Sequence, residues 1–382
     1  MHKGNKMNSE VKNGFLVVAD ISGYTRFLAE TELEHANGIV KDLFNSMIPE
    51  FERSVTISKF MGDAIFAHVE NVAYEKSQFM IDFSKRVYCS FSDKKDMIRI
   101  NTDCTCNACK HMDDLDLKIF IHHGEYMNQE INGSQELAGT DVNTIFRLMK
   151  NNVIESTGIE AYLMTTETAL KAMNLNYDTD SKLFGSEEYE HVGQVNYLID
   201  DLFKHWESTK KTVKYFIKKD DPLLIEELSK EFCVSPDIAF LMYTKPEWRK
   251  MNWHADKVDM FNIGGSTQGA GTTLHCHHGD EVSKMEITDW NPGEYISLKI
   301  LLPFGLSLRS TYEFVESKNG CVMKIRFGRV KSKNLFSKIM IGFVTKKLKK
   351  EFPIAFEGLL QGMQDFAKTI YQDNLDLDSK PN

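Results

Sequence analysis

Hydrophobic positions along the chain follow two patterns, and the change between them comes near residue 200. In the N-terminal half, apolar runs of strand length alternate with stretches in which apolar residues recur every three to four positions, the spacing of a helix that buries one face. These patterns predict strands at 13–22, 115–123, 159–163 and 195–199, a hairpin at 55–69, and helices at 30–51, 71–91, 138–151 and 165–173. Strands that alternate with helices predict an α/β sandwich.

The C-terminal half consists mainly of strand patterns separated by turn signals such as Asn291-Pro292-Gly293. The predicted strands form an antiparallel meander at 260–263, 272–278, 284–290, 295–302, 307–315 and 322–329. A long helix is predicted over 336–371, and a curved sheet around such a helix tends to enclose an apolar cavity. The predicted fold class of the whole chain is therefore α+β, with two domains.

The length of 382 residues also favours two domains, because single domains seldom exceed about 250 residues. We expect a disordered polar lead-in at 1–12, a first domain at 13–204, a charged linker at 205–222, a second domain at 223–372 and a tail at 373–382.

Composition excludes several classes of function. The formal net charge of −9 argues against a general nucleic-acid-binding protein. No apolar run approaches the roughly 20 residues of a membrane span, and Met1–Lys12 lacks the apolar core of a signal peptide. Seven cysteines, an odd number, fit reduced thiols better than a disulfide framework. These features predict a soluble, cytoplasmic protein.

Two carboxylates stand where predicted strands end. Asp20 follows the apolar run Phe15–Ala19, and Asp63 lies in a Met-Gly-Asp turn between two β-rich runs. An Asp in such a place is often only a turn former or a helix cap. Two of them brought together, however, are what a pair of divalent cations requires.

A third motif opens the helix predicted at 138–151. Asn143 and Arg147 are four residues apart, so they project from one helix face. An amide beside a guanidinium suits a sugar oxygen next to a phosphate. A solvated helix face is the commoner explanation of this spacing on its own.

Taken in order, these motifs resemble the catalytic domain of class III nucleotidyl cyclases. The resemblance covers residue 13 to about 200 and rests on Ala-Asp-Ile-Ser-Gly-Tyr-Thr-Arg-Phe-Leu around Asp20, Lys59-x-x-Gly-Asp63, Ile-His-His-Gly-Glu at 121–125, Glu136, Gly139 and Asn143-x-x-x-Arg147. It implies the ferredoxin-like α/β sandwich of that family. It also implies conversion of ATP to cyclic AMP and pyrophosphate by in-line attack of the ribose 3′-hydroxyl.

The resemblance assigns a role to each residue. Asp20, the backbone of Ile21 and Asp63 would hold two Mg²⁺ or Mn²⁺ ions. Asn143 would orient the ribose, and Arg147 would stabilise charge on the α-phosphate.

Lys59 and Glu136 occupy the positions that contact the base in this family. A lysine can donate to adenine N1 and a carboxylate can accept from the 6-amino group, which favours ATP. Because sites in this family form between subunits and one chain carries every group, the resemblance implies a symmetric homodimer.

Two positions depart from the family pattern. Glu136 stands where adenylyl members usually have Asp, and the stretch 190–194 lacks the lysine that usually contacts the triphosphate. The alternative is therefore a catalytically degenerate module for nucleotide binding or dimerisation, which serves a domain that binds a hydrophobic ligand.

A cysteine cluster lies outside this pattern. Cys104, Cys106, Cys109 and His111 could supply four ligands to Zn²⁺ from one loop. Reduced loop thiols are the other interpretation, because the two separated ligand pairs of a strong zinc signature are absent.

The second domain resembles the START and polyketide-cyclase (SRPBCC) superfamily with its helix-grip fold, through strand order, turns and the long terminal helix. The resemblance implies an apolar small molecule in a cavity under the helix. The lysine-rich stretch 337–352 favours a packed helix with one solvated face over contact with a membrane surface.

Overall fold

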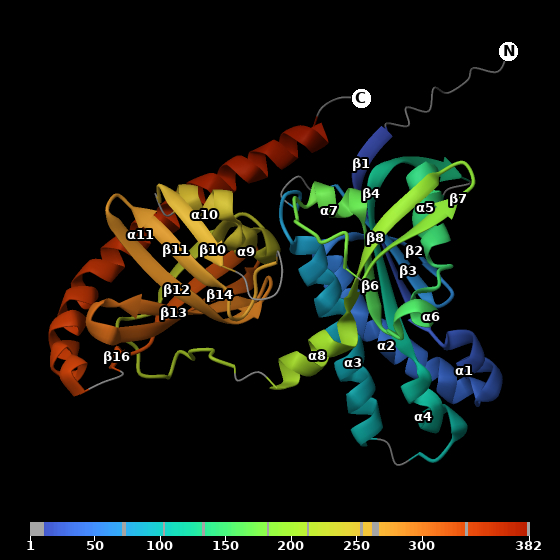
Figure 1. Ribbon diagram of the computed structural model, residues 1–382, viewed down its shortest axis with the longest axis horizontal. Coiled ribbons are helices and arrows are strands. Elements are labelled where there is room, and N and C mark those ends of the chain that lie inside the picture. Colours follow the sequence, from blue (N-terminus) through green and yellow to red (C-terminus); the bar gives the residue numbers. More distant parts are fainter. Residues whose placement is uncertain are drawn as a thin grey trace. The chain divides into compact units, whose positions relative to one another are not determined.

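A computed structural model of the protein describes residues 11–70, 74–101, 104–131, 134–181, 183–211, 214–252, 255–261, 267–332 and 335–379. The chain divides into two compact units, Met1–Thr212 and Val213–Asn382, each with its own sheet (Figure 1). The predicted mixed α+β class with two sheets is confirmed.

The first unit contains an eight-stranded sheet in the order β2-β3-β1-β4-β6-β8-β7, with β5 paired to β4. Its strands are β1 (Val11–Ser22), β2 (Thr56–Met61), β3 (Ala64–Val69), β4 (Asp116–Ile131), β5 (Ser134–Ala138), β6 (Tyr162–Thr166), β7 (Phe184–Tyr189) and β8 (Gly193–Asp201). Its helices are α1 (Tyr24–Glu30), α2 (Leu33–Ser54), α3 (Phe79–Asn101), α4 (Asn107–His111), the 3-10 turn η1 (Met112–Asp114), α5 (Thr140–Leu148), α6 (Val153–Thr157), α7 (Glu167–Ala172) and α8 (Leu202–Lys211).

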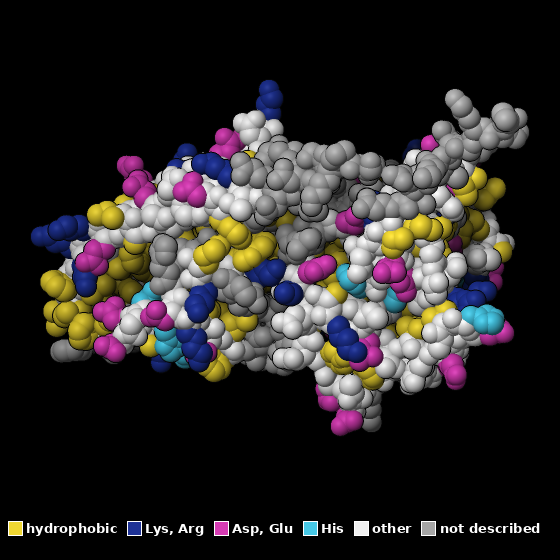
Figure 2. Space-filling view, turned by 90° about the horizontal axis from the view of Figure 1, so that it is seen from above, with side chains coloured by type: hydrophobic (Ala, Val, Ile, Leu, Met, Phe, Trp, Pro, Cys, Tyr) yellow, Lys and Arg dark blue, Asp and Glu magenta, His cyan; other side chains and the backbone are white. Residues whose placement is uncertain are grey.

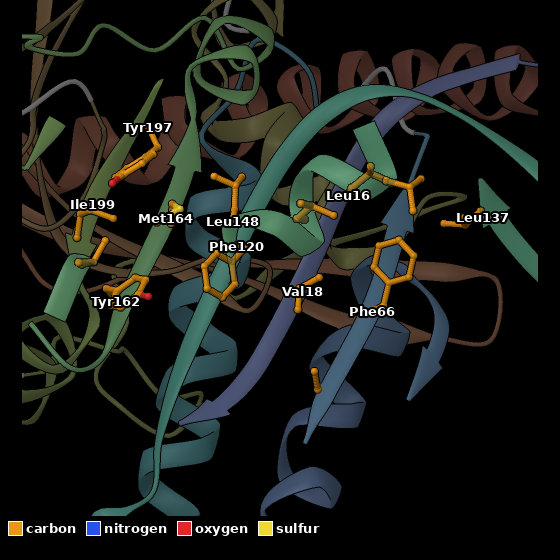
Figure 3. Close-up of a cluster of buried hydrophobic side chains, with 14 of the residues drawn as sticks. Leu16, Val18, Phe66, Phe120, Leu137, Leu148, Tyr162, Met164, Tyr197 and Ile199 are labelled. Atoms are coloured by element: carbon orange, nitrogen blue, oxygen red, sulfur yellow. The ribbon is translucent and has the colours of Figure 1, made fainter. Parts of the chain in front are cut away.

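Strand β1 lies inside this sheet, hydrogen-bonded to β3 on one side and β4 on the other. Every side chain from Phe15 to Ala19 is buried, so both faces of the strand are covered. Leu16 and Val18 belong to a hydrophobic cluster that joins the sheet to α5 and α6 (Figure 3). Val17 and its alternate neighbours face the other side, where α2 and α3 lie (Figure 1).

Helix α8 occupies the first part of the segment predicted as a linker, 205–222. Leu202 and Trp206, one helical turn apart, are buried, and Trp206 Nε1 donates to Asp93 Oδ1 of α3 at 2.8 Å. The charged residues at 207–211, part of the predicted linker, therefore belong to this helix.

The sequence pattern also misplaced several element ends. Strand β4 was expected to stop at Gly124 but continues to Ile131 and turns back into β5, which was not predicted; neither was β7. Both missed strands are short and rich in polar residues, so no apolar alternation marks them. Of the predicted lead-in, 1–10 lies outside the described residues and Val11 already belongs to β1. Positions 71–73 and 262–263 of predicted elements also lie outside the described residues.

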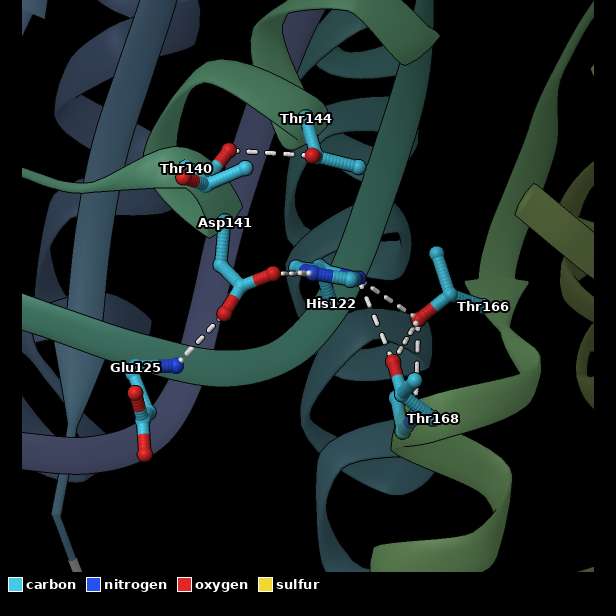
Figure 4. A network of polar contacts seen from close by, with 8 residues as sticks. His122, Glu125, Thr140, Asp141, Thr144, Thr166 and Thr168 are labelled. Carbon is cyan, nitrogen blue, oxygen red and sulfur yellow. Dashed lines mark hydrogen bonds and ion pairs between the residues drawn. The ribbon is translucent and has the colours of Figure 1, made fainter. Parts of the chain in front are cut away.

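A polar network fixes the start of α5 against β4 (Figure 4). Asp141, in the first turn of α5, accepts a hydrogen bond from Glu125 N at 2.7 Å, and its other oxygen lies 3.1 Å from Nε2 of the buried His122. The His122 Nδ1 lies 3.0 Å from Thr166 Oγ1 and 3.3 Å from Thr168 Oγ1. The histidine can thus donate to the carboxylate through Nε2 and accept a hydroxyl proton at Nδ1. The hydrogen bond from His122 holds the pKa of Asp141 below its usual value.

The second unit contains another eight-stranded sheet, in the order β10-β11-β12-β13-β14-β15-β9, with β16 paired to β14. Its strands are β9 (Leu228–Phe232), β10 (Lys257–Phe261), β11 (Thr273–His278), β12 (Glu281–Asn291), β13 (Tyr295–Leu302), β14 (Leu306–Ser317), β15 (Gly320–Phe327) and β16 (Lys331–Ser332). Its helices are α9 (Pro236–Thr244), α10 (Pro246–Asn252), the 3-10 turn η2 (Pro303–Gly305) and α11 (Leu335–Ser379). All strand pairs in this sheet are antiparallel, as the meander pattern predicts, but β9 and β16 were not predicted.

Two helices pack on this second sheet. Every residue of α9 is buried, and Ser235 caps the helix by accepting from Ile238 N. Helix α11 packs through Phe352 and Phe356, whose rings lie 5.0 Å and 4.8 Å from that of Phe327 in β15. It extends to Ser379, through most of the predicted tail.

A pocket of about 620 Å³ in the second unit lies between α11 and the segment that precedes β9. Most of the surface that lines this pocket is apolar. The lining residues are Asp221, Leu223, Leu224, Ile225, Glu226, Leu228, Lys349 and Pro353.

The exposed large hydrophobic residues in the described part of α11 are Ile339, Phe343 and Ile354. Figure 2 shows hydrophobic side chains on the surface of this unit, at the left. None of the helices in the described ranges is long and apolar enough to cross a membrane.

Replacing Gly124 by Ala should destabilise the first unit. The added Cβ would lie 2.2 Å from Asp141 Oδ2 and 2.3 Å from its Cγ, so the carboxylate would have to leave Glu125 and His122. We expect the free energy of unfolding to fall by about 1–3 kcal/mol, measured by urea unfolding of the whole chain with hydrogen exchange reporting on each unit.

Gly38→Ala is the matched control for this substitution. Gly38 lies in α2 with nothing within 4 Å of an added Cβ, so alanine should raise stability by up to about 1 kcal/mol. An equal change in the free energy of unfolding for the two variants would show that Asp141 does not need the space at Gly124.

Candidate functional site

The two predicted metal-binding carboxylates come from adjacent strands. Asp20 pairs with Ala64 across the β1–β3 ladder, and Asp63 is the residue just before Ala64, in the turn between β2 and β3. Ile21 N donates to the backbone oxygen of Asp63 at 3.0 Å, which ties the turn to the end of β1. Gly62 makes this turn possible because it adopts a φ of 66°, which favours glycine. The structure therefore brings Asp20, Ile21 and Asp63 together at one end of the β1–β3 pair.

This arrangement concentrates negative charge in a half-buried place. Burial, followed by the nearby carboxylate of Asp63, raises the pKa of Asp20 to about 6, and Lys118 partly offsets the rise. A divalent cation between the carboxylates would remove this repulsion, and carboxylate and carbonyl oxygens are the ligands that Mg²⁺ and Mn²⁺ prefer. The donor set present thus fits the predicted ions.

Lys118 was missed by the sequence analysis. It pairs with Asp20 across the β1–β4 ladder, so its side chain leaves the same face of the sheet. The only signal was a lysine inside the otherwise apolar run Leu117–Ile121, and the sequence does not reveal which residue of β1 it faces.

The two residues predicted to contact the base meet each other. Lys59 Nζ of β2 lies 2.5 Å from Glu136 Oε2 of β5, and about a third of each side chain is exposed. They are far apart in sequence and become neighbours only because the β4–β5 hairpin curls back toward β2. An adenine ring could exchange the contact between these side chains for contacts with N1 and the 6-amino group.

Asn143 and Arg147 lie exposed on α5, as the helical spacing predicts. Arg147 Nη1 donates to the backbone oxygen of Glu190 at 2.9 Å, which places the β7–β8 turn beside this arginine. This turn lies in the stretch 190–194 and contains His191. Among the described residues, neither Asn143 nor Arg147 forms a hydrogen bond or ion pair with the Asp20–Asp63 pair.

The cysteine cluster differs from its prediction in one ligand. Cys104, Cys106 and Cys109 converge with His35, the third residue of α2, and their ligand atoms all lie within 4.8 Å of one another. His111 is not among them and instead lies 3.1 Å from Asp114. Sequence spacing favoured His111 because it is near; His35 is separated from Cys106 by 71 positions and reaches it only through the fold.

Comparison with known proteins gives one family match and one curated relative. Residues 40–157 match the family described as "Protein of unknown function (DUF2652)", a stretch that includes Lys59, Asp63, Glu136, Asn143 and Arg147. An uncharacterized protein of Mycobacterium tuberculosis is 26% identical over 122 residues, which are 32% of this chain and 55% of that protein. The chain thus spans about half the length of the curated relative it matches.

Solved structures that are similar to this chain include nucleotidyl cyclases. The guanylyl cyclase Cya2 is 15% identical, with a TM-score of 0.39, over 50% of this chain and 93% of that one. The adenylyl cyclase CyaB from P. aeruginosa is 14% identical, with a TM-score of 0.38, over 51% of this chain and 97% of that one.

Proposed function

We propose that the first unit is a nucleotidyl cyclase that converts ATP to cyclic AMP and pyrophosphate. The observation that carries the proposal is the meeting of Asp20 and Asp63 at the end of the β1–β3 pair, where burial and mutual repulsion raise the pKa of Asp20 to about 6. Such a pair is a costly arrangement for a structural role, because burial and the charge of Asp63 destabilise the ionised form of Asp20. A site built for cations accounts for it.

Asp20, the backbone of Ile21 and Asp63 would hold two Mg²⁺ or Mn²⁺ ions. When bound, these ions supply positive charge to the triphosphate and lower the pKa of the ribose 3′-hydroxyl. In the reaction, the 3′-oxygen bonds to the α-phosphorus and the bond from that phosphorus to the pyrophosphate oxygen breaks. The hydroxyl proton leaves to solvent.

Lys59 and Glu136 would contact the base and select for it. Their direct contact pairs the two charges before the nucleotide arrives. Lys59 would then donate to adenine N1 and Glu136 would accept from the 6-amino group. Guanine offers the opposite donor and acceptor at these atoms, so we propose that ATP is preferred.

Part of each site would come from a second copy of the chain. Asn143 and Arg147 project from the exposed side of α5, and in one chain they make no contact with the Asp20–Asp63 pair among the described residues. A two-fold homodimer would allow each chain to supply the Asp20–Asp63 carboxylates to one site and Lys59, Asn143 and Arg147 to the other. Arg147 would then leave the Glu190 backbone oxygen for the α-phosphate.

The second unit would bind an apolar small molecule that regulates this activity. The observation in favour is the pocket beside α11, whose apolar lining includes Leu224, Leu228 and Pro353. The resemblance of the second unit to helix-grip proteins also supports an apolar ligand.

The first test is incubation of the purified protein with ATP, GTP, CTP and UTP in turn, each with Mn²⁺, and detection of cyclic products by mass spectrometry. We expect cyclic AMP to dominate. Asp20→Asn and Asp63→Asn should abolish the product, and Arg147→Ala should lower kcat by roughly 10³-fold or more.

Asp42→Asn is the control for these carboxylate variants, because Asp42 pairs with Lys94 on the surface of α2 and should leave turnover unchanged. Metal-dependent ATP binding without any cyclic product, in a folded dimer, would instead support the degenerate nucleotide-binding module.

A second test asks whether the site forms between chains. The inactive Asp20→Asn and Arg147→Ala proteins are mixed in equal amounts and allowed to exchange subunits. About half of the dimers then contain one chain of each variant, and each of these dimers has one intact site of two. About a quarter of wild-type activity should therefore return. Activity that stays at the level of the separate variants would place both groups in one chain.

A third test concerns the second unit. Native mass spectrometry of the whole protein should detect a co-purified apolar molecule, and Leu224→Glu should reduce its occupancy because a carboxylate would replace an apolar lining residue. Val282→Glu, at an exposed position of β12 outside the pocket, is the control. Equal occupancy in both variants would exclude this pocket.

A further inference from the structure

The cluster of His35, Cys104, Cys106 and Cys109 has no part in the proposed reaction. Its four ligand atoms come from two separate places in the fold: the first turn of α2, and the segment that leads into and through α4. Among the described residues, it is the one group of three or more His, Cys, Asp or Glu side chains that could hold a metal ion, and its ligand atoms all lie within 4.8 Å of one another.

The spacing of these atoms matches a tetrahedral metal site. His35 Nδ1 lies 3.2 Å from Cys106 Sγ and 3.6 Å from Cys104 Sγ. With Zn–S near 2.3 Å and Zn–N near 2.0–2.1 Å, tetrahedral geometry requires ligand atoms roughly 3.5–3.8 Å apart. The 3.2 Å contact would lengthen slightly, and the wider separations, all within 4.8 Å, would shorten by up to about 1 Å. Three sulfurs with one imidazole nitrogen are a preferred set for zinc.

The surroundings of the sulfurs favour thiolates. Cys106 is the N-cap of α4, and its Sγ accepts a hydrogen bond from Cys109 N at 3.4 Å. Backbone N–H groups that point at sulfur stabilise its negative charge, which is the form that binds metal.

A separate contact holds the two halves of the cluster together. Glu32, the residue before α2, accepts from Asn107 N at 3.2 Å and from Ala108 N at 3.0 Å, at the start of α4. His35 is therefore positioned opposite the cysteines by contacts that do not involve the ligands themselves. This reduces the ordering that metal binding would have to supply.

We propose that His35, Cys104, Cys106 and Cys109 form a structural Zn²⁺ site. Binding would release the protons of the three thiols and leave His35 neutral, with its Nδ1 on the metal. All four tetrahedral positions would be filled by protein, as in zinc sites that stabilise a fold and not in those that bind substrate. The proposal stands apart from the cyclase assignment.

The site would brace the turn that follows Asp20. The backbone oxygen of Asp114, at the end of η1, lies so close to Gly23 that an added Cβ there would be 2.6 Å from it. The segment α4–η1 therefore packs on the turn between β1 and α1, and zinc would fasten this segment to the start of α2. Loss of the metal should loosen the elements around the end of β1.

The test is metal analysis of the full chain, purified anaerobically without chelators. We expect elemental mass spectrometry to find one zinc ion per chain. Replacement of zinc by Co²⁺ should produce a thiolate-to-metal charge-transfer absorption band. His35→Ala should weaken Zn²⁺ binding by more than the roughly 10–100-fold that loss of a merely supporting residue costs. Affinity is measured by competition with a chromophoric chelator.

The matched controls are His111→Ala and Cys233→Ser, which should keep wild-type affinity and stoichiometry. If His35→Ala does not fold, X-ray absorption of the zinc-loaded wild-type protein decides, with three sulfurs and one nitrogen as the expected ligands. Equal affinity of the His35 and His111 variants, fewer than three sulfur ligands, or a disulfide between cluster cysteines in place of metal would each overturn the proposal.

Discussion

The pairing of β1 with β3 and β4 is the constraint on which the first unit depends. Phe15–Ala19 is buried on both faces, so a shift of register by one residue would move every side chain of the strand to the wrong side of the sheet. With the register fixed, Asp20 must lie opposite Ala64 and Lys118. The hydrophobic core thereby holds a carboxylate next to a second one, a position that their repulsion alone would oppose.

The same strands also decide where the exposed groups of α5 stand. The buried imidazole of His122 links the Thr166 hydroxyl, at the end of β6, to Asp141, and this carboxylate also accepts from the backbone of β4. A negatively charged residue in the first turn interacts favourably with the helix dipole, so the anchor adds to helix stability. The helix presents Asn143 and Arg147 outward, toward whatever binds on that face.

The first unit therefore carries two kinds of polar cluster. One is tied into the sheet through backbone pairing, as with Asp20 and Lys118, or through the curl of a hairpin, as with Lys59 and Glu136. The other joins helices that are distant in sequence, as the cysteine cluster joins α2 to α4. The positions of the residues in the first kind follow from strand register. Those in the second kind depend on how helices pack outside the sheet, so strand register does not fix them.

The sequence by itself determined the elements with strong periodicity: β1, the β2–β3 hairpin, α5 and strands β11–β15 of the second unit. These elements are specified locally, because apolar alternation or helical spacing reflects which face is buried. Only the tertiary structure decided that α8 docks on α3, that Lys118 faces Asp20 and that His35 replaces His111 beside the cysteines. Such contacts join residues far apart along the chain, and no local pattern encodes the distance between them once the chain has folded.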